Sequence, residues 1–251
     1  MNKKILFLHI PKTAGSTIIT SFKNLQDKDI NIKYYSIGFK SQNPKFSTKF
    51  FNDININKNI NILSGHFVFS EDCKNFNLFT MVRNILDLFI SNLYFMYKEA
   101  YLLKKLNIKN TEAIKKNIDI DLDFSDNDLP KILNILKNNY VTSNIITKTL
   151  AGIPFNKFFY VFDDNKIKEE DFLKARQNLE HFSFIGQAEN INFFIKKFLN
   201  YVPINTTTYT SVNIFKKKQQ IVDKIKNELS NEIINYNYYD SELLSIIKKK
   251  F

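Results

Sequence analysis

Short apolar runs alternate with amphipathic stretches along much of the chain, a pattern typical of proteins in which strands and helices follow one another. The apolar runs predict strands at Ile5–Leu8, 60–63, Asn77–Val82, 158–162 and 182–186, with a further short strand near 32–36. Apolar residues at helical spacing predict helices after the first loop and over 85–105, 134–150, 168–180, 191–199 and 214 to the C-terminus. Because strands that alternate with helices pair in parallel, we expect an α/β fold in which helices cover both faces of a parallel sheet.

The length and composition fit one domain over residues 1–251, since a hydrophobic share of 44% is enough for a substantial core. With only five glycines and five prolines, no glycine-rich linker divides the chain. The net charge of +11 favours an anionic partner, but it does not choose among nucleotide, polysaccharide, nucleic acid and membrane surface. We expect no nucleic-acid partner, because no zinc-finger, helix-turn-helix or RNP-like signature accompanies the charge.

The expected location follows from the N-terminus, the apolar runs and the cysteine content. The first predicted strand begins at about Lys4, which leaves no room for a signal peptide, and no apolar run approaches the roughly 18 residues of a spanning helix. The single cysteine, Cys73, cannot form an internal disulfide and suits a reducing compartment. We therefore expect a cytoplasmic protein without a membrane span.

The first loop carries the most specific chemistry in the chain. The run HIPKTAGST occupies residues 9–17, between the first predicted strand and its helix. A helix start offers unpaired backbone N–H groups and the positive end of the helix dipole. Lys12 adds a full charge, and the hydroxyl donors are Thr13, Ser16 and Thr17. This combination predicts an anion site for a phosphate group. The order differs from the nucleotide-triphosphate loop G-x-x-x-x-G-K-[ST], because the lysine precedes the glycine and the first glycine is missing.

The nonamer resembles the 5′-phosphosulfate-binding loop of sulfotransferases that use 3′-phosphoadenosine 5′-phosphosulfate (PAPS), especially the carbohydrate branch similar to heparan sulfate 2-O-sulfotransferase. The resemblance implies a P-loop-like parallel sheet and PAPS as the donor. The residues implied to hold the phosphosulfate are Lys12, Thr13, Ala14, Gly15, Ser16 and Thr17. Lys12 is also implied to be catalytic, because it stabilises the negative charge that builds on the bridging oxygen as the sulfuryl group leaves. This chemistry needs no metal, and we expect none.

A second segment matches the same family, in which an arginine at a strand end is followed eight residues later by a serine. This chain has Arg83 and Ser91 at these positions, and the resemblance implies that both hold the 3′-phosphate of the donor. The spacing places the serine about two helical turns further on, so the two side chains can approach one phosphate from different sides. The chain departs from the family at Asn84 and Ile85, where the family has Asp-Pro, and at Leu88, near which the family has a second arginine.

His66 is the candidate general base. Residues 64–68, SGHFV, end a predicted strand and resemble the segment that holds the catalytic histidine in the 2-O-sulfotransferase group. Sulfuryl transfer needs a group that takes the proton of the acceptor hydroxyl, and an imidazole that titrates near neutrality suits this task. The alternative base in related enzymes is an early glutamate, and no glutamate precedes Glu71 here. The weaker substitutes are Asp27, Asp29 and Asp53. His9 is expected to support the first loop, and no motif assigns a role to His181.

Two further polar segments have less specific patterns. Thr206 and Ser211 lie in a hydroxyl-rich stretch where the family that the chain resembles has a loop over the adenosine and its 3′-phosphate. The same stretch is equally typical of a polar surface loop. The acidic run at 119–123 is interpreted as a solvated loop, because Phe124 and Pro130 stand where an EF-hand needs glycine and glutamate.

The sequence therefore predicts an enzyme that moves a sulfuryl group from PAPS to a hydroxyl of a carbohydrate or polysaccharide acceptor. The expected lack of a membrane anchor favours a bacterial-type or otherwise cytosolic enzyme. Two other functions stay open. A nucleotide or small-molecule kinase with a divergent phosphate loop would need Mg²⁺ and an acidic ligand after a strand. A non-catalytic protein that binds anionic glycans would also explain the positive charge, and it would keep its binding without His66.

Overall fold

In the part of the chain that the structure describes, five parallel strands form the central sheet. The computed structural model describes residues 4–28, 34–37, 51, 62–105, 129–138, 143–153, 167–201 and 219–251. The strands are β1 (Ile5–Leu8), β2 (Tyr34–Ile37), β3 (Ile62–Gly65), β4 (Asn77–Val82) and β5 (Phe182–Gln187). They pair in the order β2-β3-β1-β4-β5, and every pairing is parallel. The predicted parallel sheet is confirmed, while the strand predicted at 158–162 lies outside the described residues.

Helices follow the strands and form the outer layers. The longer ones are α1 (Gly15–Lys28), α3 (Ile85–Lys105), α5 (Leu129–Asn138), α6 (Ile145–Ala151), α7 (Glu169–Asn178), α8 (Ile191–Leu199), α9 (Gln219–Tyr236) and α10 (Tyr238–Lys250). The short 3₁₀ helices are η2 (Glu71–Asn75), η5 (Leu179–His181) and η6 (Ala188–Asn190). The helices predicted over 85–105 and 191–199 are confirmed, and the predicted C-terminal pair corresponds to α9 and α10.

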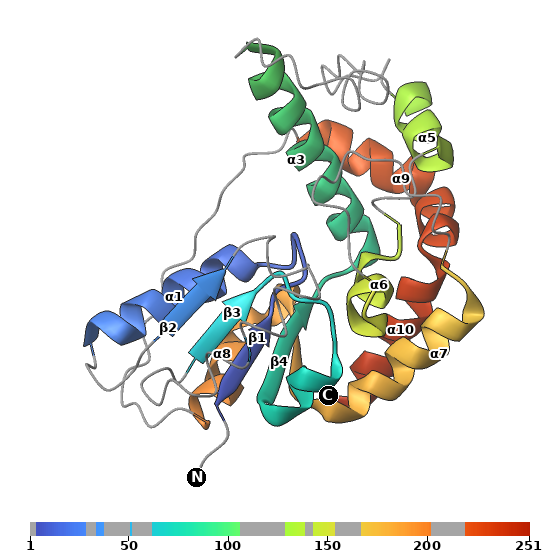
Figure 1. The fold of residues 1–251 in the computed structure, drawn as a ribbon. Coiled ribbons are helices and arrows are strands. Elements are labelled where there is room, and N and C mark those ends of the chain that lie inside the picture. The colour runs from blue at the N-terminus through green and yellow to red at the C-terminus, as the bar shows by residue number, and fades with distance from the viewer. Residues whose placement is uncertain are drawn as a thin grey trace.

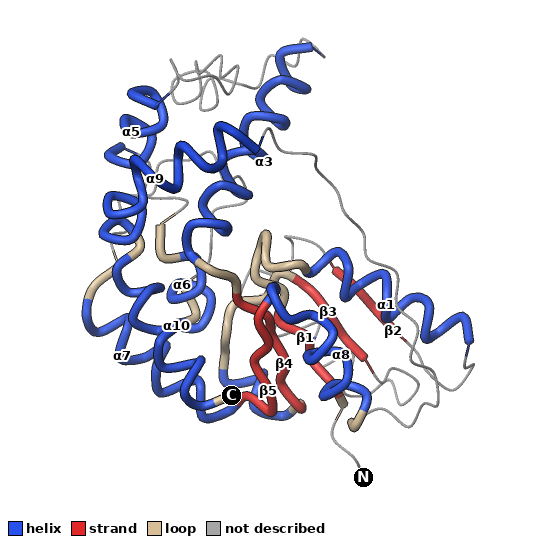
Figure 2. Tube along the Cα trace, turned by 180° about the vertical axis from the view of Figure 1, so that it is seen from behind, coloured by secondary structure: helices blue, strands red, loops and turns tan. Residues whose placement is uncertain are grey.

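Both faces of the sheet are covered, and the alternation of side chains along each strand explains how. Ile5 and Phe7 of β1 pack in one apolar layer with Ile18 of α1 and Phe194 of α8. Leu6 and Leu8 point to the other face, where the second layer includes residues of α3, α6, α9 and α10. Figures 1 and 2 show α1 and α8 on one side of the sheet and α3, α6 and α10 on the other. β1 is therefore apolar on both sides, as expected for a strand inside a parallel sheet.

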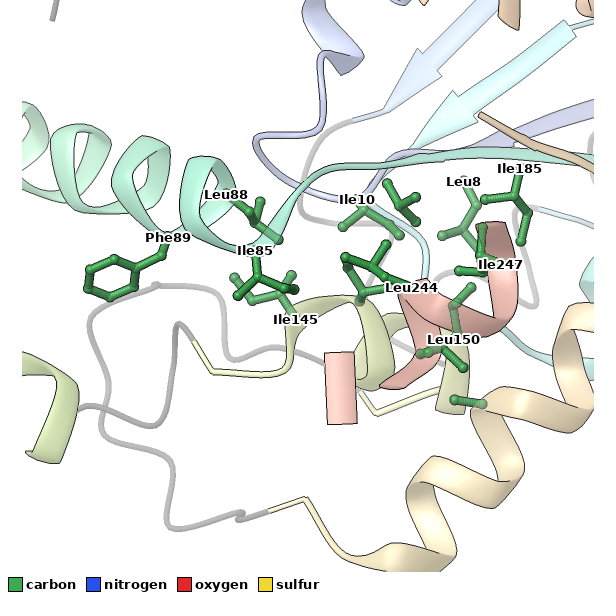
Figure 3. Packing of buried hydrophobic residues seen from close by; sticks show 14 of the residues in the cluster. Leu8, Ile10, Ile85, Leu88, Phe89, Ile145, Leu150, Ile185, Leu244 and Ile247 are labelled. Carbon is green, nitrogen blue, oxygen red and sulfur yellow. The ribbon is translucent and has the colours of Figure 1, made fainter. Parts of the chain in front are cut away.

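The second layer extends to the carboxyl edge of the sheet. In Figure 3 the labelled side chains of this layer converge from β1, β5 and three helices. Ile10, just beyond β1, lies among Ile85 and Leu88 of α3, and Leu244 of α10 lies close by. These side chains are buried. The first turn of α3 and the end of β1 are thus fixed against the same core.

One predicted helix is wrong in its extent. The apolar spacing over 134–150 predicts a single helix, but the structure has α5 ending at Asn138 and α6 beginning at Ile145. Asn144 adopts a left-handed conformation with φ of 50°, which ends helical geometry before α6. The start of α6 is capped from a distant part of the chain, because the carboxylate of Asp240 accepts hydrogen bonds from the amides of Ile146 (3.0 Å) and Thr147 (2.7 Å). Local periodicity could not reveal a cap supplied by a residue in α10.

Among the helices of the described ranges, none combines the length and apolarity that crossing a membrane requires.

The two central strands pass to helices on opposite faces of the sheet. The connection after β1 leads into α1, which lies on the face of the first layer, whereas β4 leads into α3 on the face of the second layer. The two connections therefore separate beyond the carboxyl ends of β1 and β4, which are neighbours in the sheet. Such a switch point is where open parallel sheets bind ligands. Figure 1 shows the β1–α1 loop at this edge, beside the start of α3.

Asp240 gives a test of the cap that holds α6. It is fully buried, and burial raises the pKa of its carboxyl group from 3.8 to about 6 even though three hydrogen bonds favour the carboxylate. Because the folded-state pKa is raised, the stabilisation from protonation is complete below pH about 4 and is lost as the pH rises through about 6. We expect the free energy of unfolding of the wild type, relative to Asp240→Asn, to decrease by about 3 kcal/mol between pH 4 and 7.

Urea unfolding of the two proteins at several pH values measures this difference. An equal difference at both ends of the range would contradict the raised pKa of Asp240. Glu242→Gln, an exposed substitution two residues further along α10, serves as the control.

Candidate functional site

The loop between β1 and α1 has a strained but well-supported backbone. Lys12 and Ala14 both have positive φ values, 65° and 66°. This conformation costs a residue with a side chain about 1–2 kcal/mol. Two hydrogen bonds hold the loop in this shape. The Thr13 hydroxyl donates to the Ile10 carbonyl oxygen (2.8 Å), and Arg83 Nη1 donates to the Lys12 carbonyl oxygen (3.2 Å). Strain maintained in this way is common where a backbone must present its polar groups to a ligand.

The loop leads into the first turn of α1, where two backbone N–H groups are not used in hydrogen bonds within the described part of the chain. The amides of Thr17 and Ile18 donate to the Ala14 carbonyl oxygen, at 3.1 and 3.3 Å. The amides of Gly15 and Ser16 donate no hydrogen bond to any part of the chain that the structure describes. Ser16 is exposed. Free amides at the positive end of a helix dipole form an anion site, so this geometry can receive a phosphate or sulfate group.

Arg83 and Lys12 bring two positive charges to this loop from neighbouring strands. Arg83 follows β4, is half-buried, and binds the Lys12 carbonyl oxygen as described above. It is one of only two arginines in the sequence, the other being Arg176. Lys12 Nζ lies 4.5 Å from the centre of the Phe95 ring, a cation–π contact with α3. Ser91 lies one helical turn before Phe95, and residues four apart share one face of a helix. Both predicted residues therefore lie on elements that contact Lys12: Arg83 at the end of β4 and Ser91 in α3.

His66 lies directly after β3 with a defined tautomer. Its Nδ1 is 2.9 Å from the His9 carbonyl oxygen. Because a carbonyl oxygen only accepts hydrogen bonds, Nδ1 carries the proton and the neutral ring has its lone pair on Nε2. Burial lowers the pKa of His66 to about 4, although the bond to the His9 carbonyl acts in the opposite direction. This pKa differs from the titration near neutrality that the sequence predicts for an imidazole base, because burial disfavours the charged ring. At neutral pH His66 is an uncharged imidazole with the basic lone pair on Nε2, and it is a weaker base than an ordinary histidine.

The backbone after His66 is held by α6. The Phe69 amide donates to the Thr149 carbonyl oxygen (2.8 Å). Gly152, which ends α6 with φ of 81°, lies so close that a Cβ there would be 2.5 Å from the Phe69 carbonyl oxygen. Gly152 is the C-cap of α6, and its amide donates to the carbonyl oxygens of Lys148 and Thr149. These contacts connect the His66 segment to the capped helix and fix where its imidazole lies.

The predicted site residues differ in their surroundings. Thr13 is fully buried and its hydroxyl is turned inward to Ile10, so its side chain braces the loop instead of facing a ligand. Thr17 is buried and its carbonyl oxygen accepts a hydrogen bond from Ser21. The predicted residues outside the described part of the chain are Thr206, Ser211, Asp29 and Asp53.

Phe95 and His9 contact the candidate site residues, although the sequence motifs assign neither of them a role in the reaction. The Phe95 ring receives the Lys12 ammonium group, and the His9 ring stacks on His66 with 4.1 Å between ring centres. For Phe95 the available signal is its position four residues after Ser91 on a predicted helix. For His9 the sequence offers only proximity to the loop, because β1 and β3 must pair before the two histidines meet.

Comparison of the sequence with family models and with curated proteins gives no match. Within the described residues, no group of three or more His, Cys, Asp and Glu side chains is arranged to hold a metal ion.

Gly15 provides a direct test of this packing. A Cβ at this position would lie 1.7 Å from His9 Nε2 and 2.5 Å from His9 Cε1, so alanine cannot fit unless the ring moves. We expect Gly15→Ala to destabilise the protein by about 1–3 kcal/mol, although alanine favours helices. Thermal and urea unfolding measure this loss, with the exposed Ser16→Ala as the control.

The double variant His9→Ala/Gly15→Ala should recover much of the lost stability, because removal of the ring makes room for the added methyl group. Additive effects of the two substitutions would show that the two residues do not compete for this space.

Proposed function

We propose that this protein is a sulfotransferase that moves a sulfuryl group from PAPS to a hydroxyl group of a carbohydrate acceptor. The observation that carries the proposal is the contact between Arg83 and the Lys12 carbonyl oxygen (3.2 Å), which joins two cations from neighbouring strand ends at the start of α1. A donor with two separate anionic ends needs two cationic positions on one rigid edge. PAPS has such ends, a 5′-phosphosulfate and a 3′-phosphate. The carbohydrate acceptor follows from the sequence resemblance.

In this proposal the 5′-phosphosulfate lies on the loop of residues 12–17. The free amides of Gly15 and Ser16 and the dipole of α1 support an anion there. The 3′-phosphate lies between Arg83 and Ser91, which come from the end of β4 and from α3. In this proposal the sheet is P-loop-like, because the strand, the loop and the helix together would bind the anionic group.

The proposed reaction is a single displacement at sulfur. His66 Nε2 removes the proton of the acceptor hydroxyl as the acceptor oxygen forms a bond to sulfur. The bond between sulfur and the bridging oxygen breaks, and its electron pair stays on the 5′-phosphate of the leaving 3′-phosphoadenosine 5′-phosphate (PAP). Lys12 stabilises that growing charge, which is larger in the transition state than in the bound donor.

To stabilise this charge, the ammonium group of Lys12 must move away from the Phe95 ring. Its ammonium group lies over the Phe95 ring, an interaction worth about 0.5–2 kcal/mol. A charge-assisted contact with the donor is stronger, at about 1.5–3 kcal/mol. Donor binding would therefore draw the ammonium group from the ring to the bridging oxygen, while the Lys12 carbonyl oxygen stays on Arg83.

Calorimetry with PAP tests the two cationic positions. We expect Lys12→Ala and Arg83→Ala each to raise the Kd for PAP about 10- to 100-fold, because each removes a charge-assisted contact. Lys23→Ala and Arg176→Ala remove the same charges from exposed positions and should leave the Kd within about twofold. Tighter binding of ATP–Mg²⁺ than of PAP by the wild type would instead favour the kinase hypothesis.

Transfer of radiolabelled sulfate from PAPS to a panel of glycans tests the chemistry. We expect His66→Ala to lower kcat about 10²- to 10⁴-fold with little change in the affinity for PAP. The control is His181→Ala, at an exposed position in η5. A protein that binds glycans without transferring sulfate would correspond to the non-catalytic hypothesis.

The pH dependence of the transfer activity should reflect the lowered pKa of His66. Only neutral His66 can accept the proton, so activity rises with pH through its pKa and stays level above it. Because kcat/KM reports the free enzyme, we expect it to be flat from pH 5.5 to 8, with a decrease only toward pH about 4. An inflection near 6.5, the ordinary value for histidine, would contradict the assignment of His66 as a buried base.

A further inference from the structure

His9 is a buried polar side chain that lies beside the proposed base. Its exposed fraction is only 8%, although it immediately follows β1 at the ligand-binding edge of the sheet. Its backbone amide donates to the Gly65 carbonyl oxygen (2.8 Å), which continues the pairing of β1 and β3 by one residue. This bond fixes the His9 backbone against the residue that precedes His66.

The main chain and the side chain of His9 both contact His66. The His9 carbonyl oxygen accepts the hydrogen bond from His66 Nδ1 (2.9 Å). The two imidazole rings stack with 4.1 Å between centres and 26° between planes. One residue thus supplies both the acceptor that selects the His66 tautomer and the surface on which the ring lies.

The His9 ring is itself fixed by its surroundings. Phe7 stacks beside it with 6.0 Å between ring centres. On another side, the backbone of Gly15 is so near that a Cβ would be 1.7 Å from His9 Nε2. The ring therefore links the start of α1, where the donor would bind, to the proposed base.

Charge at this position is unfavourable. Burial, the adjacent His66 and the nearby Lys12 all lower the pKa of His9, and the result is well below its usual range. His9 consequently stays neutral while His66 gains a proton. A neutral ring stacked on an imidazolium adds no like charge, so it does not oppose proton uptake as a second cation would.

We propose that His9 is a positioning residue for His66: its ring and carbonyl oxygen hold the imidazole with Nδ1 protonated, so that Nε2 is the nitrogen that accepts the acceptor's proton. The role rests on the proposed sulfotransferase function for its catalytic meaning. The orientation and the tautomer of His66 are properties of the protein alone, and they can be measured without any substrate.

Measuring the tautomer of His66 is the most direct test of this proposal. The spectrum is simple because the sequence has three histidines. Two-bond ¹H–¹⁵N correlation spectra of histidine-labelled protein at pH 7 distinguish a protonated from an unprotonated ring nitrogen. His66→Ala and His181→Ala assign the signals. We expect wild-type His66 to be protonated at Nδ1, whereas free histidine in water favours protonation at Nε2. Protonation of wild-type His66 at Nε2 would overturn the proposal without the need for a His9 variant.

His9→Ala tests the contribution of the ring. The carbonyl oxygen of residue 9 remains in this variant, but the ring that stacks on His66 is lost. We therefore expect the His66 imidazole to rotate away from that carbonyl oxygen part of the time and then to be protonated at Nε2, and its pKa to move up toward 6.5 as water reaches the ring. In transfer assays kcat should fall about 10- to 100-fold while the KM for PAPS changes less, because the base is displaced more than the donor site. An unchanged tautomer with kcat within about threefold of the wild type would reduce His9 to a space-filling role.

The double variant His9→Ala/Gly15→Ala separates positioning from packing. The added methyl group occupies part of the space of the lost ring, so the double variant should be more stable than Gly15→Ala alone. His66 should nevertheless remain a mixture of the Nδ1- and Nε2-protonated forms. Recovery of the wild-type tautomer would show that filled space is sufficient and would overturn the proposal. Should wild-type protein bind PAP but transfer no sulfate, or not bind PAP, the proposed function fails, while the NMR result still decides whether His9 positions His66.

Discussion

The hydrogen bond from Arg83 to the Lys12 carbonyl oxygen is the contact on which the candidate site depends. It joins the ends of β1 and β4 at the point where their connections separate to opposite faces of the sheet. It also supports Lys12 in a left-handed conformation that a residue with a side chain seldom adopts. Without it, the loop would lose a hydrogen bond that holds its backbone to the end of β4, and the free amides of α1 would no longer share a fixed frame with the cations. An anion site requires that frame, because a mobile donor pays an entropic cost each time it binds.

The candidate base, His66, is supported by a second set of contacts. Asp240 of α10 caps α6, and the Thr149 carbonyl oxygen of α6 accepts the amide of Phe69, three residues after His66. His9 completes the support from β1. These contacts come from three distant parts of the chain, so the position of one imidazole depends on how β1, α6 and α10 pack together. Buried polar groups that are fully paired give rigidity of this kind, since leaving any one of them unpaired is costly.

The net charge of this protein does not by itself identify a functional site. A net charge of +11 is carried almost wholly by lysines, and many of these are solvated. Arg83 differs from them because its planar guanidinium can hold a backbone carbonyl with one nitrogen and still present others to a phosphate. Lys12 differs because its side chain is placed on Phe95 by the fold. The candidate site is thus distinguished by where two cations are held, and not by how many the chain has.

The parallel sheet, its helices on both faces and the segments that reach its carboxyl edge could all be predicted from apolar periodicity, because strands buried on both sides and amphipathic helices are local patterns. The loop of residues 9–17, Arg83 and His66 could be predicted as candidates from the residue types at strand ends. The break between α5 and α6 could not, since Asp240 supplies the cap from far along the chain. Nor could the tautomer of His66, its lowered pKa, the inward turn of Thr13 or the contacts of His9 and Phe95. The sequence by itself determined which chemical groups lie at which strand ends. Only the tertiary structure decided which of them touch, which are buried and which nitrogen has a proton, because these depend on neighbours brought together by strand pairing and on the exclusion of water.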